Sequence, residues 1–320
     1  YKGKGELVTY CEAYSRALNG FIVSREQNYQ LELRSGICCV EDSDASDINS
    51  LLDRANMALK TIKVKGAAQW KFYGHTMRDK LLREKDLEIR MEKALADGEF
   101  LVYIQPKYWV GTRALAGGEA LVRWKSPDQG FLSPGEFIPL FEKNRFIVKL
   151  DQFMFTSVCG LLRQWLDAGI EPRPLSVNVS RMQFHTPDFV ERYIRIKSQY
   201  AIPDGLLELE FTESIFFDNV ALLSSAVHEL RRAGIKCSID DFGAGYSSLN
   251  VLKALPVSVL KLDGMFFRTA KDDEQAKIVI RNIMRMAGEL KMATVAEGVE
   301  THEQVAFLET TGCDIIQGYV

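Results

Sequence analysis

The sequence lacks the patterns that mark membrane spans and zinc sites. A membrane-spanning helix needs about 18 or more consecutive apolar residues, and no such run occurs among the 320 residues. The six cysteines include no Cys-x-x-Cys spacing, and the four histidines include no His-x-x-x-His spacing. The usual zinc motifs are therefore excluded. Most of the cysteines have apolar neighbours, and we expect reduced thiols in a cytoplasmic segment.

An excess of charge of one sign is also lacking. The 40 basic residues are balanced by 43 acidic ones, which gives a net charge of −3. Without a basic stripe, a nucleic acid polymer is not expected as a partner. No Gly-x-Ser-x-Gly motif supports a serine hydrolase. The sequence begins at Tyr1 without a Met or a signal peptide, so we expect a segment of a longer protein, with room for an upstream sensor or membrane domain.

The hydrophobic share of 47% predicts an ordinary globular protein with one large domain or two domains. Residues 1–75 are predicted to form a small α/β piece. It should contain strands at residues 31–39 and 69–73, a helix at residues 45–60, and a hairpin turn at residues 3–7.

Residues 76–97 are predicted to form a connecting helix. Eleven of the sixteen residues from Arg78 to Lys93 are charged. One narrow apolar stripe remains, formed by Leu87, Met91, Ala94 and Leu95. A helix that transmits a signal between domains is the alternative interpretation.

Residues 98–320 predict a closed (β/α)8 barrel, because strands alternate with helices. The expected strands are 100–108, 117–122, 175–179, 206–211, 235–239, 259–262, 292–296 and 314–318. The expected helical stretches are 137–166, 188–200, 222–233, 274–290 and 302–310. The connection at residues 109–116 is too short for a parallel crossover, so the first strand should run antiparallel. The sequence stops just past the eighth strand, and a last helix is expected to be absent.

Polar side chains follow nearly every predicted strand, at the end where the active sites of such barrels lie. They are Glu119, Asn178, Glu210 with Glu213, Asp240 with Asp241, Lys261 with Asp263, Glu297 with Glu300, and Gln317. Each alone could be an ordinary surface residue, but so many acids at one rim would repel one another without bound cations. Oxygen ligands without Cys or His select Mg²⁺ or Mn²⁺. Their number suits two ions sharing an Asp, an arrangement that cleaves phosphodiesters.

Several long motifs occur in order over residues 98–320. They are Tyr103-Ile-Gln105-Pro106, Glu119-Ala-Leu121-Val-Arg123-Trp124, Phe137-Ile-Pro139, Leu175-Ser-Val-Asn178-Val-Ser180, Leu207-Glu-Leu-Glu210-Phe-Thr-Glu213-Ser214, Asp240-Asp241-Phe-Gly-Ala-Gly-Tyr-Ser-Ser-Leu249, Leu260-Lys261-Leu-Asp263, Ala296-Glu297-Gly-Val-Glu300 and Gln317-Gly-Tyr319. This region resembles EAL domains, the phosphodiesterases of bacterial cyclic di-GMP. The departures are modest. Lys107 and Trp109 stand where small or apolar residues are usual, and Ser258 stands where Asp is frequent.

The resemblance implies an EAL-type barrel that hydrolyses cyclic di-GMP to linear pGpG with a water activated by two cations, Mg²⁺ or Mn²⁺. It implies that Glu119, Asn178, Glu210 and Asp240 hold one ion. Asp240, Asp241 and Glu297 would hold the second, with Lys261 at the attacking water and Glu213 bracing the loop 240–248. It further implies a homodimer and a nucleotide pocket formed by Gln105, Leu121, Arg123, Asp263, Glu300 and Gln317.

Residues 1–75 resemble the later part of a GGDEF (diguanylate cyclase) domain. The residues that carry this resemblance are Arg54-Ala-Asn-Met-Ala-Leu59, Lys63, Phe72-Tyr73 and Ser35-Gly-Ile37. Residues 3–7 then fall where Gly-Gly-Asp-Glu-Phe belongs, with Lys4 and Gly5 replacing the glycine and the acid that a cyclase needs. The resemblance therefore implies a partial, degenerate domain.

Two other functions compete with the phosphodiesterase. A catalytically weak EAL domain could act as a cyclic di-GMP receptor, but such members usually lose metal ligands and here all are present. A sugar-metabolising barrel enzyme would need phosphate-binding glycines after its last two strands, which Gly298 and Gly318 fit poorly.

Overall fold

The computed structural model describes residues 4–22, 34–40, 47–62, 70–213, 215, 220–243, 256–269 and 273–320. The chain folds into two compact units, Tyr1–Ile89 and Arg90–Val320. The first contains a two-stranded sheet and the second a nine-stranded sheet. None of the helices in the described ranges is long and apolar enough to cross a bilayer.

The N-terminal unit contains helices α1 (Lys4–Ile22) and α2 (Ile48–Lys60), strands β1 (Ser35–Ile37) and β2 (Trp70–Phe72), and the first part of α3 (His75–Ala96). Strands β1 and β2 pair in parallel, and Asp47 caps α2 by accepting from the Ser50 backbone N–H. Gly36 allows β1 to approach α2, because a Cβ there would lie 1.9 Å from the Ala55 carbonyl oxygen.

The hairpin turn predicted for residues 3–7 is wrong. Gly3 lies outside the described residues, and Lys4 to Leu7 form the first turn of α1. A single glycine costs a helix only about 1 kcal/mol, and the side chain of Thr9 donates to the Gly5 carbonyl oxygen within this helix. The strand predicted at residues 31–39 is described only from residue 34 and is limited to β1.

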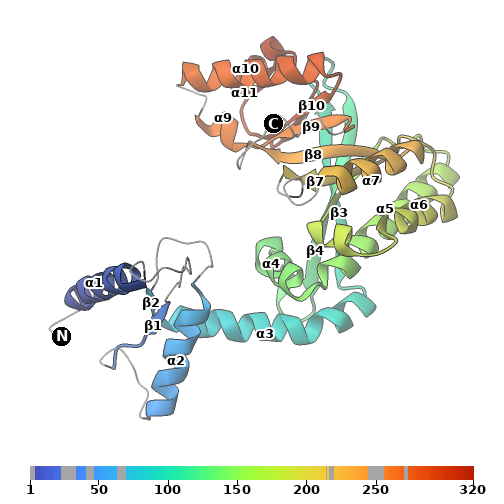
Figure 1. Cartoon of the computed structure of the whole chain (residues 1–320). Helices are drawn as coiled ribbons and strands as arrows, with labels where there is room; N and C mark the ends of the chain where they lie inside the picture. The colour runs from blue at the N-terminus through green and yellow to red at the C-terminus, as the bar shows by residue number, and fades with distance from the viewer. Residues whose placement is uncertain are drawn as a thin grey trace. The chain divides into compact units, whose positions relative to one another are not determined.

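The second unit is a closed eight-stranded barrel, as predicted (Figure 1). Its strands are β3 (Phe100–Trp109), β4 (Leu115–Ser126), β6 (Leu175–Val179), β7 (Leu207–Thr212), β8 (Lys236–Phe242), β9 (Val259–Leu262), β10 (Ala293–Val299) and β11 (Ile315–Gly318). Strand β3 pairs antiparallel with both β4 and β11, which confirms the predicted antiparallel first strand. The short β5 (Gly130–Leu132), which was not predicted, extends the sheet beyond β4.

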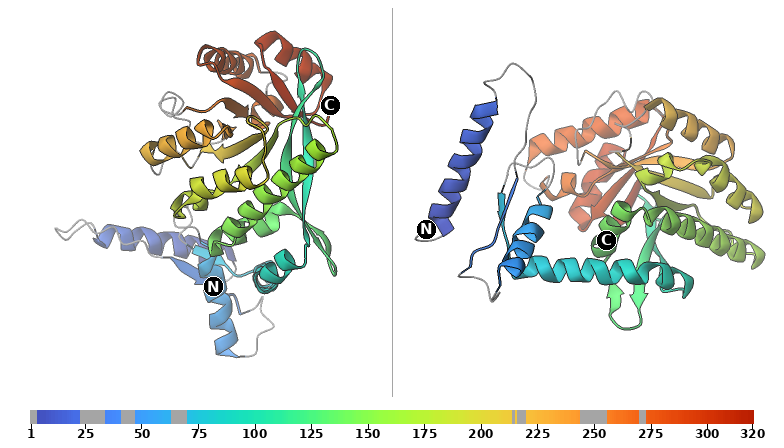
Figure 2. Two further views of the ribbon diagram at one scale, coloured as in Figure 1. Left: turned by 90° about the vertical axis from the view of Figure 1, so that its right-hand side faces the viewer. Right: turned by 60° about the horizontal axis from the view of Figure 1, so that its bottom comes forward.

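Helices cover the outside of the barrel (Figure 2). They are α4 (Pro134–Asn144), α5 (Ile147–Asp167), α6 (Phe189–Gln199), α7 (Val220–Arg232), α9 (Met265–Thr269), α10 (Glu274–Glu289) and α11 (His302–Thr311), with a 3-10 turn η1 (Arg181–His185). The single helical stretch predicted at residues 137–166 is wrong, because Arg145 ends α4 in the left-handed conformation with φ 67°. The Asn144 side chain then accepts from the Phe146 N–H before α5 begins.

Alternation along the strands separates an apolar outer layer from a polar barrel interior. In β7, Leu207, Leu209 and Phe211 belong to the hydrophobic core shared with the helices. The intervening Glu208 and Glu210 are buried as well, and Glu210 contacts lysines of two other strands. Successive side chains of a strand point to opposite faces. The strands therefore bury leucines under the helices that cover the barrel, and carboxylates in the barrel interior.

A cluster of aromatic side chains anchors α4 to the end of β4. Trp124 is fully buried, and its ring centroid lies 5.6 Å from that of Phe137 and 5.8 Å from that of Phe141. The indole N–H donates to Glu99 Oε2 over 2.7 Å. This packing fixes the part of β4 that carries Leu121 and Arg123.

Candidate active site

Lys261, in β9, is fully buried at the centre of four carboxylates. Its Nζ lies 2.6 Å from Glu210, 2.6 Å from Glu297, 3.0 Å from Asp240 and 3.3 Å from Glu119. Burial alone would lower the pKa of Lys261, but the surrounding carboxylates raise it well above its ordinary value. The side chain is therefore a permanent cation that draws acids of four strands together.

Amide side chains extend this cluster to neighbouring strands. Asn178 in β6 donates to Glu119 Oε1 over 2.7 Å. Gln317 in β11 donates from Nε2 to Glu119 Oε2 over 2.8 Å and to Gln105 Oε1 over 3.1 Å. Residues far apart in the sequence thus meet inside the barrel.

The four acids of the cluster outnumber the two lysines that contact them, Lys261 and Lys107. Burial raises the pKa of Glu119 and of Asp240, and it raises the pKa of Glu297 to about 8. For Glu210, burial would also raise the pKa, but Lys261 and Lys107 lower it to about 2. A group of buried acids with raised pKa values is one in which an added cation is favourable.

Three acids have the arrangement of a metal site. Carboxylate oxygens of Asp240, Asp241 and Glu297 lie within 4.8 Å of one another. Asp241 adopts a left-handed conformation with φ 55°, and its backbone N–H donates to Asp240 Oδ1 over 2.9 Å. Carboxylate oxygens without nitrogen or sulfur ligands fit a hard divalent cation.

The remaining predicted residues of the rim differ in their contacts. Glu213 accepts from the Gly243 N–H over 3.2 Å; most of the loop that it was predicted to brace lies outside the described residues. Asp263 accepts from the Met265 N–H over 2.6 Å, and its carboxylate adds to the effect of burial in raising the pKa of Asp241. Glu300 is exposed, and within the described ranges no hydrogen bond or ion pair joins its side chain to the cluster.

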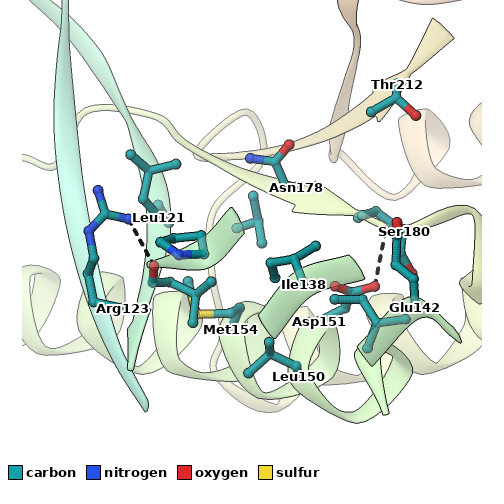
Figure 3. Close-up of a pocket in the computed structure, with 16 residues that line it drawn as sticks. Leu121, Arg123, Ile138, Glu142, Leu150, Asp151, Met154, Asn178, Ser180 and Thr212 are labelled. Atoms are coloured by element: carbon teal, nitrogen blue, oxygen red, sulfur yellow. Dashed lines mark hydrogen bonds between the residues drawn. The ribbon is translucent and has the colours of Figure 1, made fainter. Parts of the chain in front are cut away.

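A cavity of about 260 Å³ adjoins Asn178, the residue that donates to Glu119 of the cluster (Figure 3). Leu121 and Arg123 line it together with Asn178, which also contacts Glu119. At its far side lies Asp151 of α5, whose Oδ2 accepts from the Ser180 N–H over 3.0 Å and from Gln183 over 3.2 Å. Burial raises the pKa of Asp151 to about 7. Of the six residues predicted to form the nucleotide pocket, Leu121 and Arg123 line this cavity.

Sequence reasoning missed two residues of this region. Lys107 was treated only as a departure from a family pattern. It lies two residues after Gln105 in β3, however, and side chains two residues apart in a strand point to the same face. Its Nζ donates to Glu210 Oε1 over 2.8 Å. Asp151 is the single acid in the apolar stripe of α5, and a charged residue on a buried helix face was the signal that could have identified it.

Comparison with known proteins identifies the family. Residues 89–320 match the EAL domain. The chain belongs to the EAL domain family. It is 31% identical over 317 residues to the cyclic di-GMP phosphodiesterase PA2567 of Pseudomonas aeruginosa, covering 98% of this chain and 54% of that protein. It is 32% identical over 277 residues to the bifunctional diguanylate cyclase/cyclic di-GMP phosphodiesterase MucR of the same organism, covering 87% of this chain and 40% of that protein.

A solved EAL structure has the same fold. The PaMucR phosphodiesterase in complex with c-di-GMP superimposes with a TM-score of 0.69 at 35% identity, covering 73% of this chain and 95% of that one. The chain spans about a third to a half of the length of the curated relatives that it matches.

Proposed function

We propose that the barrel hydrolyses cyclic di-GMP to linear pGpG with two divalent cations, Mg²⁺ or Mn²⁺. The observation that carries this proposal is the convergence of Glu119, Glu210, Asp240 and Glu297 on Lys261 inside an EAL barrel. The names of two relatives, PA2567 and MucR, include cyclic di-GMP phosphodiesterase activity, and the PaMucR structure contains c-di-GMP.

The resemblance to EAL domains supplies the ligand assignment, and the grouping of Asp240, Asp241 and Glu297 supports its second half. Glu119, Asn178, Glu210 and Asp240 would hold one cation, and Asp240, Asp241 and Glu297 the other. Two bound cations would supply Lewis-acid stabilisation of the phosphate and an activated water for in-line attack. Lys261 would keep its proton and orient that water, while it screens negative charge that develops on the phosphate.

The neighbouring cavity suits one guanine base. Guanine presents an N–H and an amino group on one edge, and carboxylates accept from both. The cavity contains two acids, Glu142 and Asp151, and Arg123 at the side of β4. Leu121 would pack against the base, and Gln105, Asp263, Glu300 and Gln317 would contact the rest of the nucleotide from the rim.

The test is a hydrolysis assay with the purified chain, cyclic di-GMP and Mg²⁺, followed by chromatography of the products. We expect pGpG to accumulate and chelation of the metal to stop it. A catalytically weak receptor, the competing function, would bind cyclic di-GMP without turnover in any divalent cation, and that result would contradict the proposal.

We also propose an organisation for the rest of the chain. Residues 1–75 would be a partial, degenerate GGDEF-like domain, 76–97 a connecting helix and 98–320 the phosphodiesterase barrel. The diguanylate cyclase activity in the name of MucR supports the first part. The whole protein would be a cytoplasmic homodimer. It would also carry an upstream sensor or membrane domain, since its relatives are longer. Light scattering on the purified chain would test the dimer.

A further inference from the structure

A second buried lysine reaches the carboxylate cluster from β3. Lys107 is only 5% exposed, and its Nζ donates to Glu210 Oε1 over 2.8 Å and to Ser176 Oγ over 2.7 Å. Ser176 in turn donates to the Gly118 carbonyl oxygen over 3.4 Å. The Lys107 ammonium group is thus held by side chains of β6 and β7, and Ser176 is held in turn by β4.

The two oxygens of Glu210 consequently have different surroundings. Oε2 contacts Lys261 over 2.6 Å, and the same ammonium group contacts Glu119, Asp240 and Glu297. Oε1 is bound by Lys107 instead. Only Oε2 is therefore directed toward the residues that would hold a cation, while Oε1 is tied to the opposite side.

We propose that Lys107 is a positioning residue that limits Glu210 to one-oxygen coordination and thereby favours Mg²⁺ or Mn²⁺ over Ca²⁺. The inference rests on the cation site of the proposed function. Ca²⁺ takes six to eight oxygens and accepts bidentate carboxylates, whereas Mg²⁺ needs a near-ideal octahedron. A Glu210 that can offer a single oxygen meets the requirement of the smaller ion and withholds a ligand from the larger one.

One substitution removes this constraint and a second one loosens it. Lys107→Met keeps an unbranched apolar stem out to Cε but frees Oε1, so that Glu210 can rotate and offer both oxygens. Ser176→Ala changes no charge and removes only the hydroxyl group that holds the Lys107 ammonium. It provides a second test if the loss of a buried charge prevents Lys107→Met from folding.

The experiment is a calorimetric titration of the purified full chain with MnCl₂ and, separately, with CaCl₂, in the absence of nucleotide. The measured quantity is the ratio of the two dissociation constants. We expect Lys107→Met to shift this ratio toward Ca²⁺ by about tenfold, and Ser176→Ala to shift it less in the same direction. The matched control is Lys197→Met, which removes another buried lysine, one that bonds Asp204 and the Ala233 carbonyl outside the cluster; its ratio should equal that of the wild type.

An unchanged ratio in a folded Lys107→Met variant would overturn the role of Lys107. If that variant does not fold, an unchanged ratio in Ser176→Ala would do the same. If the wild-type chain hydrolyses cyclic di-GMP and the variants have the same ratio of dissociation constants as the wild type, the inference about Lys107 is refuted and the proposed function stands. A wild-type chain that binds neither cation refutes the proposed cation site as well.

Discussion

Glu119 contacts side chains of three other strands, namely Asn178, Gln317 and Lys261. We predict that Glu119→Ala abolishes hydrolysis, with a fall in the rate of at least about 100-fold. Loss of a group that only supports a metal ligand costs up to about 100-fold, and loss of a ligand itself should cost more. Cyclic di-GMP binding should persist in part, because Arg123 and the cavity remain. Rates at saturating Mg²⁺ and a binding titration measure both effects. The exposed Glu289→Ala is the control, and an undiminished rate for Glu119→Ala would contradict the ligand assignment.

The buried Asp151 should make the barrel less stable as the pH rises. Its pKa is about 7 in the folded chain against an ordinary value of 3.8, because burial disfavours the charged form and Glu142 adds to the effect. Between these two values the unfolded chain has released the proton and the folded chain has not. The free energy of unfolding therefore falls with rising pH by about 1.4 kcal/mol per pH unit in this interval. The stability that the neutral Asp151 contributes is fully present below the unfolded pKa and is lost as the pH rises through the folded one.

Asp151→Asn should remove this dependence, since the amide stays neutral at every pH. Urea unfolding of wild type and variant at pH 5, 6, 7 and 8 measures the difference. We expect the variant's stability to decline less steeply between pH 5 and 7. Parallel curves for the two proteins would show that Asp151 is ionised in the folded chain.

At the scale of elements, the close approach of β3 and β4 depends on Gly118. A Cβ there would lie 2.5 Å from Ile104 Cγ2 and 3.3 Å from the Gln105 carbonyl oxygen. We predict that Gly118→Ala destabilises the barrel by about 1–3 kcal/mol through overpacking, and that it weakens nucleotide binding by displacing Gln105 and Glu119. Thermal unfolding and a binding titration test this.

The matched control is Gly288→Ala in α10, where a Cβ meets nothing within 4 Å. Alanine is the better helix former by roughly 0.5–1 kcal/mol, so this variant should be as stable as the wild type or slightly more. If both alanine variants had the same stability, the steric argument for Gly118 would be wrong.

At the scale of the whole molecule, the identity of the cation should separate binding from turnover. Ca²⁺ holds oxygen ligands at about 2.3–2.6 Å and Mg²⁺ at about 2.0–2.1 Å, so the same carboxylates can accept Ca²⁺ in a looser site. We predict that Ca²⁺ permits cyclic di-GMP binding but inhibits hydrolysis in competition with Mg²⁺. Rising Ca²⁺ at fixed Mg²⁺ in the hydrolysis assay, with a binding titration in Ca²⁺ alone, tests this. Full turnover in Ca²⁺ alone would contradict it.

The N-terminal unit should have no diguanylate cyclase activity. If residues 3–7 correspond to the GGDEF motif, Lys4 and Gly5 replace the glycine and the metal-binding acid that a cyclase needs. Both lie in the first turn of α1 rather than in a hairpin. Incubation of the purified chain with GTP and Mg²⁺ should therefore yield no cyclic di-GMP. Because hydrolysis by the barrel could mask a product, the assay uses the Glu119→Ala variant, and formation of cyclic di-GMP or pGpG would overturn the prediction.

The sequence by itself determined the barrel and the approximate residues of its strands. Alternation of apolar and polar residues is a local property, and the short link between the first two strands dictated that β3 runs antiparallel. The polar residues at the strand ends followed from the same pattern, because parallel strands bring their carboxyl ends to one rim.

Only the tertiary structure decided which of these side chains meet and what surrounds them. The left-handed Arg145 that divides α4 from α5 and the helical start of α1 depend on packing and on local competition that composition does not reveal. The positions of Lys107 against Glu210 and of Asp151 beside Ser180 join residues 103 and 29 positions apart in the chain. Closure of the barrel creates the first contact, and packing of α5 against the end of β6 creates the second. Burial then gives both their strength, because a charge removed from water needs a partner that only the folded chain can supply.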